Sequence, residues 1–407
     1  MSNIESLPKK FPPSLLMSIL SGFAAFLNLY TAQPFFVELS NCFHVSISAI
    51  AFVQSMLLLV LAVSSPFVSA CNDIYGRDLM LKISFSGLVI CQLVTAVATK
   101  FWVFALAQSL LGLFPPAIIT AAVIAASRQS THEASLRGSR LYVISIASGG
   151  TTSRLLSGVI SDVFGGWRSS YMAIGLITAV LSLIVVMLWI KPDNHHATVH
   201  LRKHSLKNKV LHIVSELSDH LTNIRLLKVY FCGFLLLFSI ISVYTINVLR
   251  LSNYPFETSA TERGALFLAN LFGCLIASRA MVVLHNRGYT FWYCSVLSMV
   301  LGVLICWIPS KFFVFLGTFI AVSGCFGIQI CSLPSVSIRA TRAHSSAVGL
   351  YTTFYYLGGF LGSYCMAYLY EYKGVSYCMT SLLMVFVILM VLPLSVGSNK
   401  SVDRRAG

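Results

Sequence analysis

The stretch Phe101–Ser127 reads FWVFALAQSLLGLFPPAIITAAVIAAS and contains no Asp, Glu, Lys or Arg. Because a helix needs about 20 predominantly apolar residues to cross the hydrocarbon core of a bilayer, this stretch is long enough to span a membrane. The chain is 57% hydrophobic and only 10% charged over 407 residues, which excludes an ordinary soluble protein. Four more runs lack these charges: Ser169–Ile190, Val229–Leu249, Gly288–Ser310 and Phe312–Ile338. The sequence therefore predicts an all-α polytopic membrane protein.

Apolar runs along the whole chain predict about twelve transmembrane helices. We expect them near residues 14–37, 47–70, 79–98, 102–126, 141–164, 168–190, 227–250, 263–284, 289–308, 312–336, 346–370 and 376–396. Most of the 28 Lys and Arg residues then lie in connections on the side that holds the N-terminus. On the other side are only Lys100, Arg168, Arg250, Arg263, Lys311 and Lys373. This bias places both termini in the cytoplasm, and it explains the net charge of +15 by orientation and contact with anionic lipid rather than by nucleic-acid binding.

One long polar connection, Lys191–Lys228, divides the spans into two sets of six. We predict an N-terminal six-helix half over residues 1–190, a cytoplasmic linker over 191–226, and a C-terminal half with a short tail over 227–407. Apolar residues at helical spacing predict a short amphipathic helix on the membrane surface within the linker: Val210, Leu211, Val214, Leu217 and Leu221. The linker histidines His196, His200 and His204 recur every four residues, which suits either a metal site or, as we expect, a solvated and pH-sensitive segment. We expect no metal and no cofactor.

The two halves share a pattern that indicates an internal duplication. Leu141-Tyr142 is followed by Gly149-Gly150, and Leu350-Tyr351 is followed by Gly358-Gly359, with an offset of 209 residues at each position. Parallel repeats of six spans build one large class of transporters, with the substrate site between the repeats near the midplane. The expected fold is therefore two six-helix bundles around a central site.

The loop between the second and third expected spans has the sequence SACNDIYGRDLMLK, residues 69–82. Gly76 permits a tight turn there, and Asp73 can face Arg77 and the N-terminus of a neighbouring helix. The loop resembles the cytoplasmic motif of the major facilitator superfamily, a Gly, three residues, then Asp-Arg-x-Gly-Arg. Asp73, Gly76 and Arg77 match this motif, and Ser69, Ile74 and Asp78 depart from it. The resemblance implies twelve helices and a latch between the halves at this loop.

The fifth expected span is rich in small residues, which allow close approach of a neighbouring helix. It resembles the span-5 motif of antiporters in this superfamily, a Gly, three residues, then Gly-Pro-x-x-Gly-Gly. Gly149 and Gly158 match, and Arg154 takes the proline position. Together with Leu29–Pro34 and Tyr355–Gly359, it is similar to the bacterial arabinose-efflux and drug–proton antiporter branch. We expect Gly149, Gly158, Gly358 and Gly359 to lie on the faces along which the halves move.

Two features depart from proton-driven relatives. Their fourth span often has an Arg four residues before a Gly, whereas this chain has Gln108 before Gly112. In addition, none of the 13 acidic residues lies in the middle of an expected span. Because proton coupling normally needs a buried group with a movable pKa, coupling to protons rests here on the family resemblance alone.

Six polar side chains are candidates for lining a substrate cavity: Tyr30, Gln33, Gln108, Arg154, Tyr351 and Tyr355. The tyrosines offer a flat apolar face and a hydrogen bond to an amphipathic ligand, although aromatic packing between helices explains them equally well. A buried charge in a membrane is costly, so Arg154 must face a cavity or a partner. Its partner is Asp162 about two turns away, or backbone and hydroxyl groups, or an anionic substrate.

These features predict a secondary transporter that works by alternating access, with export of a small drug-like or sugar-like molecule in exchange for protons. One alternative is uptake or facilitated passage of an anionic metabolite, and another is a transporter-derived receptor or scaffold that no longer cycles. No nucleophile–base pair in the spans suggests an enzyme. The expected partners are the solute and membrane lipid for a monomer in a bacterial inner membrane.

Overall fold

The computed structural model describes residues 12–127, 132–188, 222–283, 288–339 and 344–393. These residues form only helices and their connections. In the first half they are α1 (Pro13–Leu27), the 3₁₀ helix η1 (Gln33–Phe35), α2 (Phe36–Phe43), α3 (Ile47–Tyr75), α4 (Arg77–Ala96), α5 (Phe101–Leu111), α6 (Pro115–Ser127), α7 (His132–Phe164) and α8 (Trp167–Leu188). In the second half they are α10 (Ile224–Ser252), α11 (Ala260–Ala265), the 3₁₀ helix η2 (Leu266–Leu268), α12 (Ala269–Val283), α13 (Gly288–Cys306), α14 (Lys311–Arg339), α15 (His344–Lys373) and α16 (Val375–Val391).

Each expected span corresponds to one helix or to one set of consecutive helices, so the all-α fold class is confirmed. Within the described residues, eight helical segments are long and apolar enough to cross a membrane, and α1 and α16 are shorter apolar helices. The remaining two, α7 and α15, are 33 and 30 residues long and carry more small, polar or charged residues.

Several spans are broken rather than straight. The first is interrupted at η1, which contains Pro34, and the fourth breaks between α5 and α6 directly before Pro115 and Pro116. Proline lacks the backbone N–H that an uninterrupted helix needs, which explains these two breaks. The eighth span is broken at η2. These breaks give the first and eighth spans irregular backbone.

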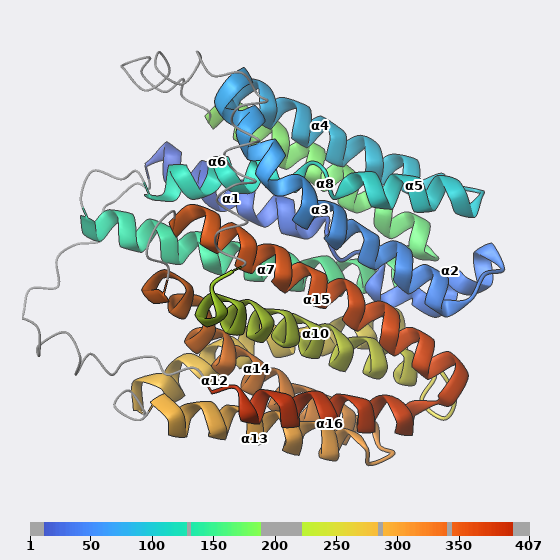
Figure 1. Ribbon diagram of the computed structural model, residues 1–407. Helices are drawn as coiled ribbons and strands as arrows, with labels where there is room; N and C mark the ends of the chain where they lie inside the picture. Colours follow the sequence, from blue (N-terminus) through green and yellow to red (C-terminus); the bar gives the residue numbers. More distant parts are fainter. Residues whose placement is uncertain (1–11, 128–131, 189–221, 284–287, 340–343, 394–407) are drawn as a thin grey trace, which may run out of the picture.

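The two halves lie side by side in Figure 1, with most of the first half above most of the second and with α7 and α15 along the boundary between them. Contacts between the halves are made mainly by α3 with α15 and by α7 with α11. We call the end that holds the α7–α8 turn at Gly165 and Gly166 the distal end, and the end that holds Gly76 the proximal end. Both α7 and α15 therefore run from the proximal to the distal end through the interface between the halves.

The same contacts recur in both halves at the positions that the sequence repeat relates. Tyr142 of α7 packs on Gly22 of α1, and Tyr351 of α15 packs on Gly233 of α10. A few residues later, a Cβ at Gly149 would collide with the backbone carbonyl of Phe23, and a Cβ at Gly358 would collide with that of Phe234. The helices that carry the repeat thus approach their own half's first helix in the same way.

The long connection between the halves lies outside the described residues. The expected amphipathic helix and the linker histidines His196, His200 and His204 fall within residues 189–221, which the structure does not describe. The boundaries 1–190, 191–226 and 227–407 accordingly stay predictions.

Candidate functional site

A cavity of about 450 Å³ lies between the halves. It is lined from the first half by α1 and α7 and from the second half by α10, α12, α14 and α15. Its charged residue is Arg154, and its polar residues are Tyr30, Tyr244, Asn270, Gln329 and Tyr355. The other lining residues are apolar or small: Phe26, Val143, Ile146, Ala147, Gly150, Leu237, Ile240, Ile241, Cys274, Phe326 and Ile330. The cavity is thus an amphipathic site with one cation.

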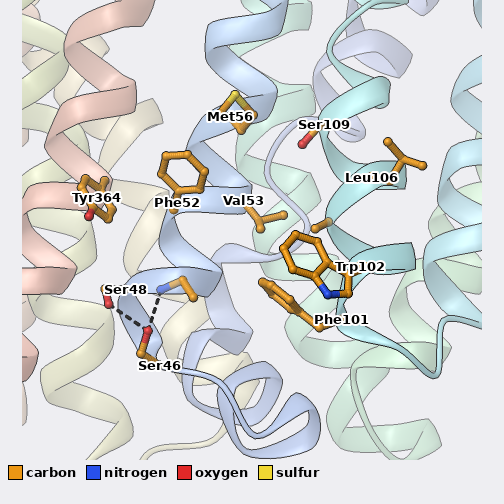
Figure 2. A pocket seen from close by; sticks show the side chains of 12 residues that line it. Ser46, Ser48, Phe52, Val53, Met56, Phe101, Trp102, Leu106, Ser109 and Tyr364 are labelled. Atoms are coloured by element: carbon orange, nitrogen blue, oxygen red, sulfur yellow. Dashed lines mark hydrogen bonds between the residues drawn. The ribbon is translucent and has the colours of Figure 1, made fainter.

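A second hollow, of about 590 Å³, lies at the periphery between α3, α5 and α15 (Figure 2). Its lining is mostly apolar, with the hydroxyls of Ser46 and Ser48 at one end, and no charged side chain lines it. Trp102 in its wall is 79% exposed, as expected of a side chain on the membrane-facing surface. The central cavity is therefore the better candidate for a functional site.

Arg154 is held by groups from both halves although it is only 4% exposed. Its Nε donates to Oε1 of Gln33 at 2.5 Å, and its Nη1 donates to the carbonyl of Gly150 at 2.8 Å. The ring of Tyr30 lies 3.7 Å from the guanidinium carbon, and the ring of Phe267 lies 4.4 Å from it. Cation–π contacts of this kind stabilise a charge that has lost its water. Because Tyr30 belongs to the first half and Phe267 to η2 of the second, Arg154 joins the halves.

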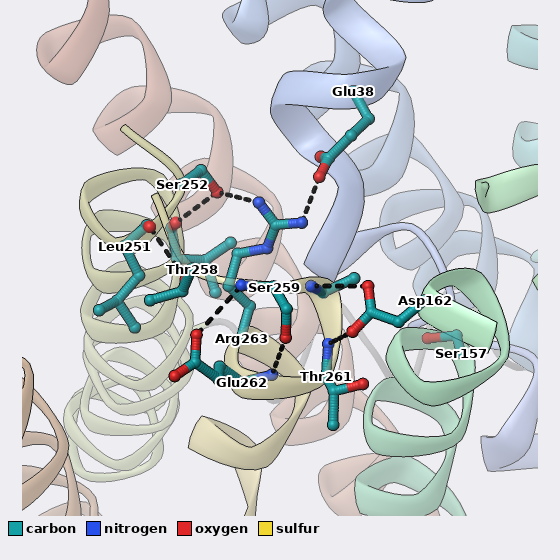
Figure 3. Close-up of polar contacts among 12 residues, drawn as sticks. Glu38, Ser157, Asp162, Leu251, Ser252, Thr258, Ser259, Thr261, Glu262 and Arg263 are labelled. Carbon is teal, nitrogen blue, oxygen red and sulfur yellow. Dashed lines mark hydrogen bonds and ion pairs between the residues drawn. The ribbon is translucent and has the colours of Figure 1, made fainter. Parts of the chain in front are cut away.

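The acceptors of Arg154 are all neutral. Within the described residues, no carboxylate forms an ion pair with it, and the neutral side chain of Tyr30 is a further hydrogen-bond partner. The interpretation of Asp162 as the partner of Arg154 is wrong, because the Asp162 carboxylate accepts hydrogen bonds from the backbone N–H groups of Ala260 and Thr261 at 3.2 and 2.8 Å (Figure 3). Asp162 lies further along α7 than Arg154, at the distal end. There the backbone N–H groups at the N-terminus of α11 donate hydrogen bonds to its carboxylate.

Carboxylates close the distal end of the interface. Asp162 of α7 caps the N-terminus of α11 in the second half, and Glu371 of α15 accepts a hydrogen bond from the backbone N–H of Ser48 near the N-terminus of α3, at 3.1 Å. Asp162 and Glu371 are 209 residues apart, so the repeat relates them as well. Glu38 adds an ion pair to Arg263, which also donates to the hydroxyl of Ser252 at 2.9 Å (Figure 3).

The cavity lies on the proximal side of these closures. Val143, Ile146 and Ala147, which line it, precede Arg154 on α7, whereas Gly158 beyond Arg154 packs against the carbonyl of Ala260 in the other half. The structure is therefore closed between the cavity and the distal end.

The expected cavity residues divide into three groups. Tyr30, Arg154 and Tyr355 line the cavity, and Gln33 contributes through its bond to Arg154. Tyr351 instead lies behind the wall, where its hydroxyl is 3.1 Å from that of Ser332. Gln108 donates to Thr95 at 3.2 Å inside the first half, so it is not among the residues that line the cavity.

Several lining residues were not predicted from the sequence. Asn270 lies 2.9 Å from the hydroxyl of Tyr244, and Gln329 lies 3.3 Å from that of Tyr355, which forms two polar pairs on the wall of the second half. Asn270 and Gln329 could have been found from the sequence, because each is an amide side chain within an apolar run. Phe267 gave no signal, because one aromatic residue among many does not reveal a cation–π contact.

The glycines that we expected on the moving faces of the two halves make two kinds of contact. Gly158 faces the second half, and Gly359 packs against Leu58 of α3 across the interface as well as against Leu237. Gly149 and Gly358 instead pack within their own halves.

At the proximal end, Gly76 has φ 90°, a conformation that favours glycine, and it separates α3 from α4. Arg77 is the first residue of α4. The side chain of Asp73, which belongs to α3, lies outside the described part of the structure, so the latch stays a prediction.

Comparison with known proteins identifies the family. Residues 18–363 match the Major Facilitator Superfamily. The chain belongs to this superfamily. An uncharacterized transporter of Buchnera aphidicola subsp. Schizaphis graminum is 24% identical over 392 residues, which cover 95% of this chain and 92% of the relative. The inner membrane transport protein YnfM of Escherichia coli is 28% identical over 271 residues, or 66% of this chain and 63% of that protein.

The solved structures agree on the fold. The structure of a bacterial homologue of the human lysosomal transporter Spinster has a TM-score of 0.70, at 13% identity and with coverage of 93% of this chain and 95% of that chain. The family resemblance and the fold class predicted from the sequence are confirmed, and the protein is a multi-pass membrane transporter of this superfamily.

Proposed function

We propose that this transporter exports a small amphipathic organic anion by alternating access, with Arg154 as the counter-charge of the substrate. The observation that carries the proposal is a cationic side chain in the wall of the central cavity whose hydrogen-bond acceptors are neutral. A buried cation without a counter-charge is unfavourable, and an anion in the cavity would supply the missing charge.

The rest of the cavity suits an amphipathic ligand. Aromatic and aliphatic side chains form most of the wall and can bury an apolar group, and the Tyr244–Asn270 and Gln329–Tyr355 pairs offer hydrogen bonds on the opposite side from α7. Arg154 lines the cavity, where its guanidinium can donate charge-assisted hydrogen bonds to a carboxylate, sulfonate or phosphate oxygen. These features favour an aromatic acid over a sugar.

Alternating access would use the two ends of the interface in turn. Opening the distal end requires loss of the Asp162, Glu371 and Glu38 contacts, and closing the proximal end would engage the loop of Asp73, Gly76 and Arg77. We place the proximal end and both termini in the cytoplasm of a bacterium, with the protein in its inner membrane, because the charge bias of the connections follows the positive-inside pattern.

Binding to the purified protein tests the proposal. The probes are 1-naphthalenesulfonate and its neutral counterpart 1-naphthalenesulfonamide, measured by calorimetry in detergent. The wild type should bind the sulfonate more tightly. Arg154→Gln should weaken sulfonate binding at least about 30-fold, because truncation of a buried charge partner costs about 2 kcal/mol or more, and it should affect the sulfonamide little.

Arg168→Gln is the matched control, since it also removes one positive charge but from the distal end of α8, away from the cavity lining. It should leave both affinities unchanged. Equal loss of both probes in Arg154→Gln would assign Arg154 a structural role and contradict the proposal. Binding without any transport would instead favour a receptor that no longer cycles.

A further inference from the structure

The charged residues of the chain are distributed unevenly along the membrane normal. Arg154 is the only Asp, Glu, His, Lys or Arg of the sequence in the middle of an expected span. The other ionisable residues of the cavity wall are Tyr30 from the turn between α1 and η1, Tyr244 from α10, Cys274 from α12 and Tyr355 from α15. None of these four is a carboxylate or a histidine, the side chains that ordinarily carry protons near neutral pH.

The positive charge of Arg154 is permanent. A guanidinium is not deprotonated in proteins, and its described partners Gln33, Gly150, Tyr30 and Phe267 are neutral. The empty cavity therefore carries one positive charge. A cavity that holds a monovalent anion beside Arg154 is neutral.

We propose that transport is electrogenic and that the membrane potential, rather than proton exchange, drives export of the anion. This inference rests on the proposed anion transport. The loaded carrier crosses as a neutral complex, releases its anion on the distal side, and returns as a cation. One negative charge thus leaves the cytoplasm in each cycle, and a potential that is negative inside favours the return step.

The size of this driving force follows from the charge moved. One elementary charge across a potential of about 100 mV corresponds to a concentration ratio of about 50-fold. The carboxylates nearest to the interface, Glu38, Asp162 and Glu371, do not replace the missing proton carrier, because they lie at the distal end and bond groups of the opposite half. Their contacts hold the distal end closed instead.

The test uses the full-length protein in proteoliposomes with 1-naphthalenesulfonate, a strong acid that carries no proton at neutral pH. In the first arm, a potassium gradient with valinomycin sets the potential while the pH is equal on both sides. The sulfonate should accumulate on the positive side, approaching about 50-fold at about 100 mV. In the second arm, a pH gradient is applied with the potential held at zero, and no accumulation should occur.

Three results would overturn the inference while leaving the proposed function intact. They are accumulation driven by the pH gradient alone, movement only when a counter-anion is present on the opposite side, and uptake that is insensitive to potential. Absence of sulfonate binding in calorimetry would instead contradict the proposed function itself. Arg154→Gln should lose potential-driven accumulation, and Arg168→Gln should retain it, which ties the effect to the cavity rather than to surface charge.

Discussion

The helices α7 and α15 make equivalent contacts in the two halves, and one buried position differs in charge. Both place a tyrosine on a glycine of their half's first helix, both carry a glycine against its backbone, and both end in a carboxylate that bonds a helix N-terminus of the opposite half. At the position 209 residues after Arg154, however, α15 has Ser363, which is 2% exposed and has a hydroxyl without a described hydrogen-bond partner. The repeated features therefore serve packing and closure, and the unique charge is the feature that we propose serves the ligand.

The largest expected effect tests the shared packing. Gly149→Leu and Gly358→Leu should each destabilise the protein by about 3 kcal/mol or more, because the new side chain would collide with the backbone carbonyl of Phe23 or Phe234. Thermal unfolding in detergent measures the loss. Gly349→Leu is the control on α15, since nothing lies within 4 Å of a Cβ at Gly349, and it should not lower the stability. A large loss of stability in only one of the two variants would contradict the equivalence of α7 and α15.

The next effect tests the paired carboxylates. Asp162→Asn should weaken the distal closure by about 1 kcal/mol, since an amide accepts fewer hydrogen bonds from the α11 N-terminus than a carboxylate does. This corresponds to about a 5-fold larger distal-open population. Glu371→Gln, which affects a single N–H group, should have a smaller effect in the same direction.

Spin labels at Phe164 and Tyr254 can measure this opening, because both side chains are exposed and lie at the distal end of opposite halves. The exposed cysteines Cys42 and Cys294 are replaced first. A distance distribution that is unchanged in both variants would show that these contacts do not hold the distal end closed.

The smallest effect tests the proximal loop, which the second half does not repeat at the related position. Asp73→Asn should slow transport of 1-naphthalenesulfonate about 2-fold with expression preserved, because loss of a charge at a helix N-terminus costs about 0.5 kcal/mol. Initial rates in proteoliposomes, normalised to the amount of inserted protein, measure the change. An unchanged rate would remove the latch hypothesis.

The sequence predicted those parts of the molecule that depend on local composition. Charge-free runs predicted the spans, and the cost of a buried charge predicted that Arg154 faces a cavity or a partner. Of the three partners left open for Arg154, the backbone is present as the Gly150 carbonyl. Asp162 is not its partner, because this carboxylate lies further along α7, where α11 offers two backbone N–H groups.

Contacts between elements that are distant in the sequence were less accessible to prediction. Gln33 was predicted as a cavity residue, but the bond that fixes it to Arg154 depends on the break at η1. Tyr244, Asn270 and Gln329 reach the cavity through the relative placement of α10, α12 and α14, which no periodicity in one helix reveals. Gln108 was predicted as a cavity residue with the family resemblance in view, but its side chain donates a hydrogen bond to the hydroxyl of Thr95 instead.

The contact of Phe267 with Arg154 would link opening of the distal end to release of a bound anion. Phe267 belongs to the second half, so separation of the halves at the distal end would carry its ring away and expose that face of the guanidinium to water. As the effective dielectric constant around the ion pair rises from about 20 towards 80, the attraction between Arg154 and a bound anion falls about fourfold. Hydration of one side of a single arginine would thus turn a tight site into a weak one on the side where the ligand has to leave.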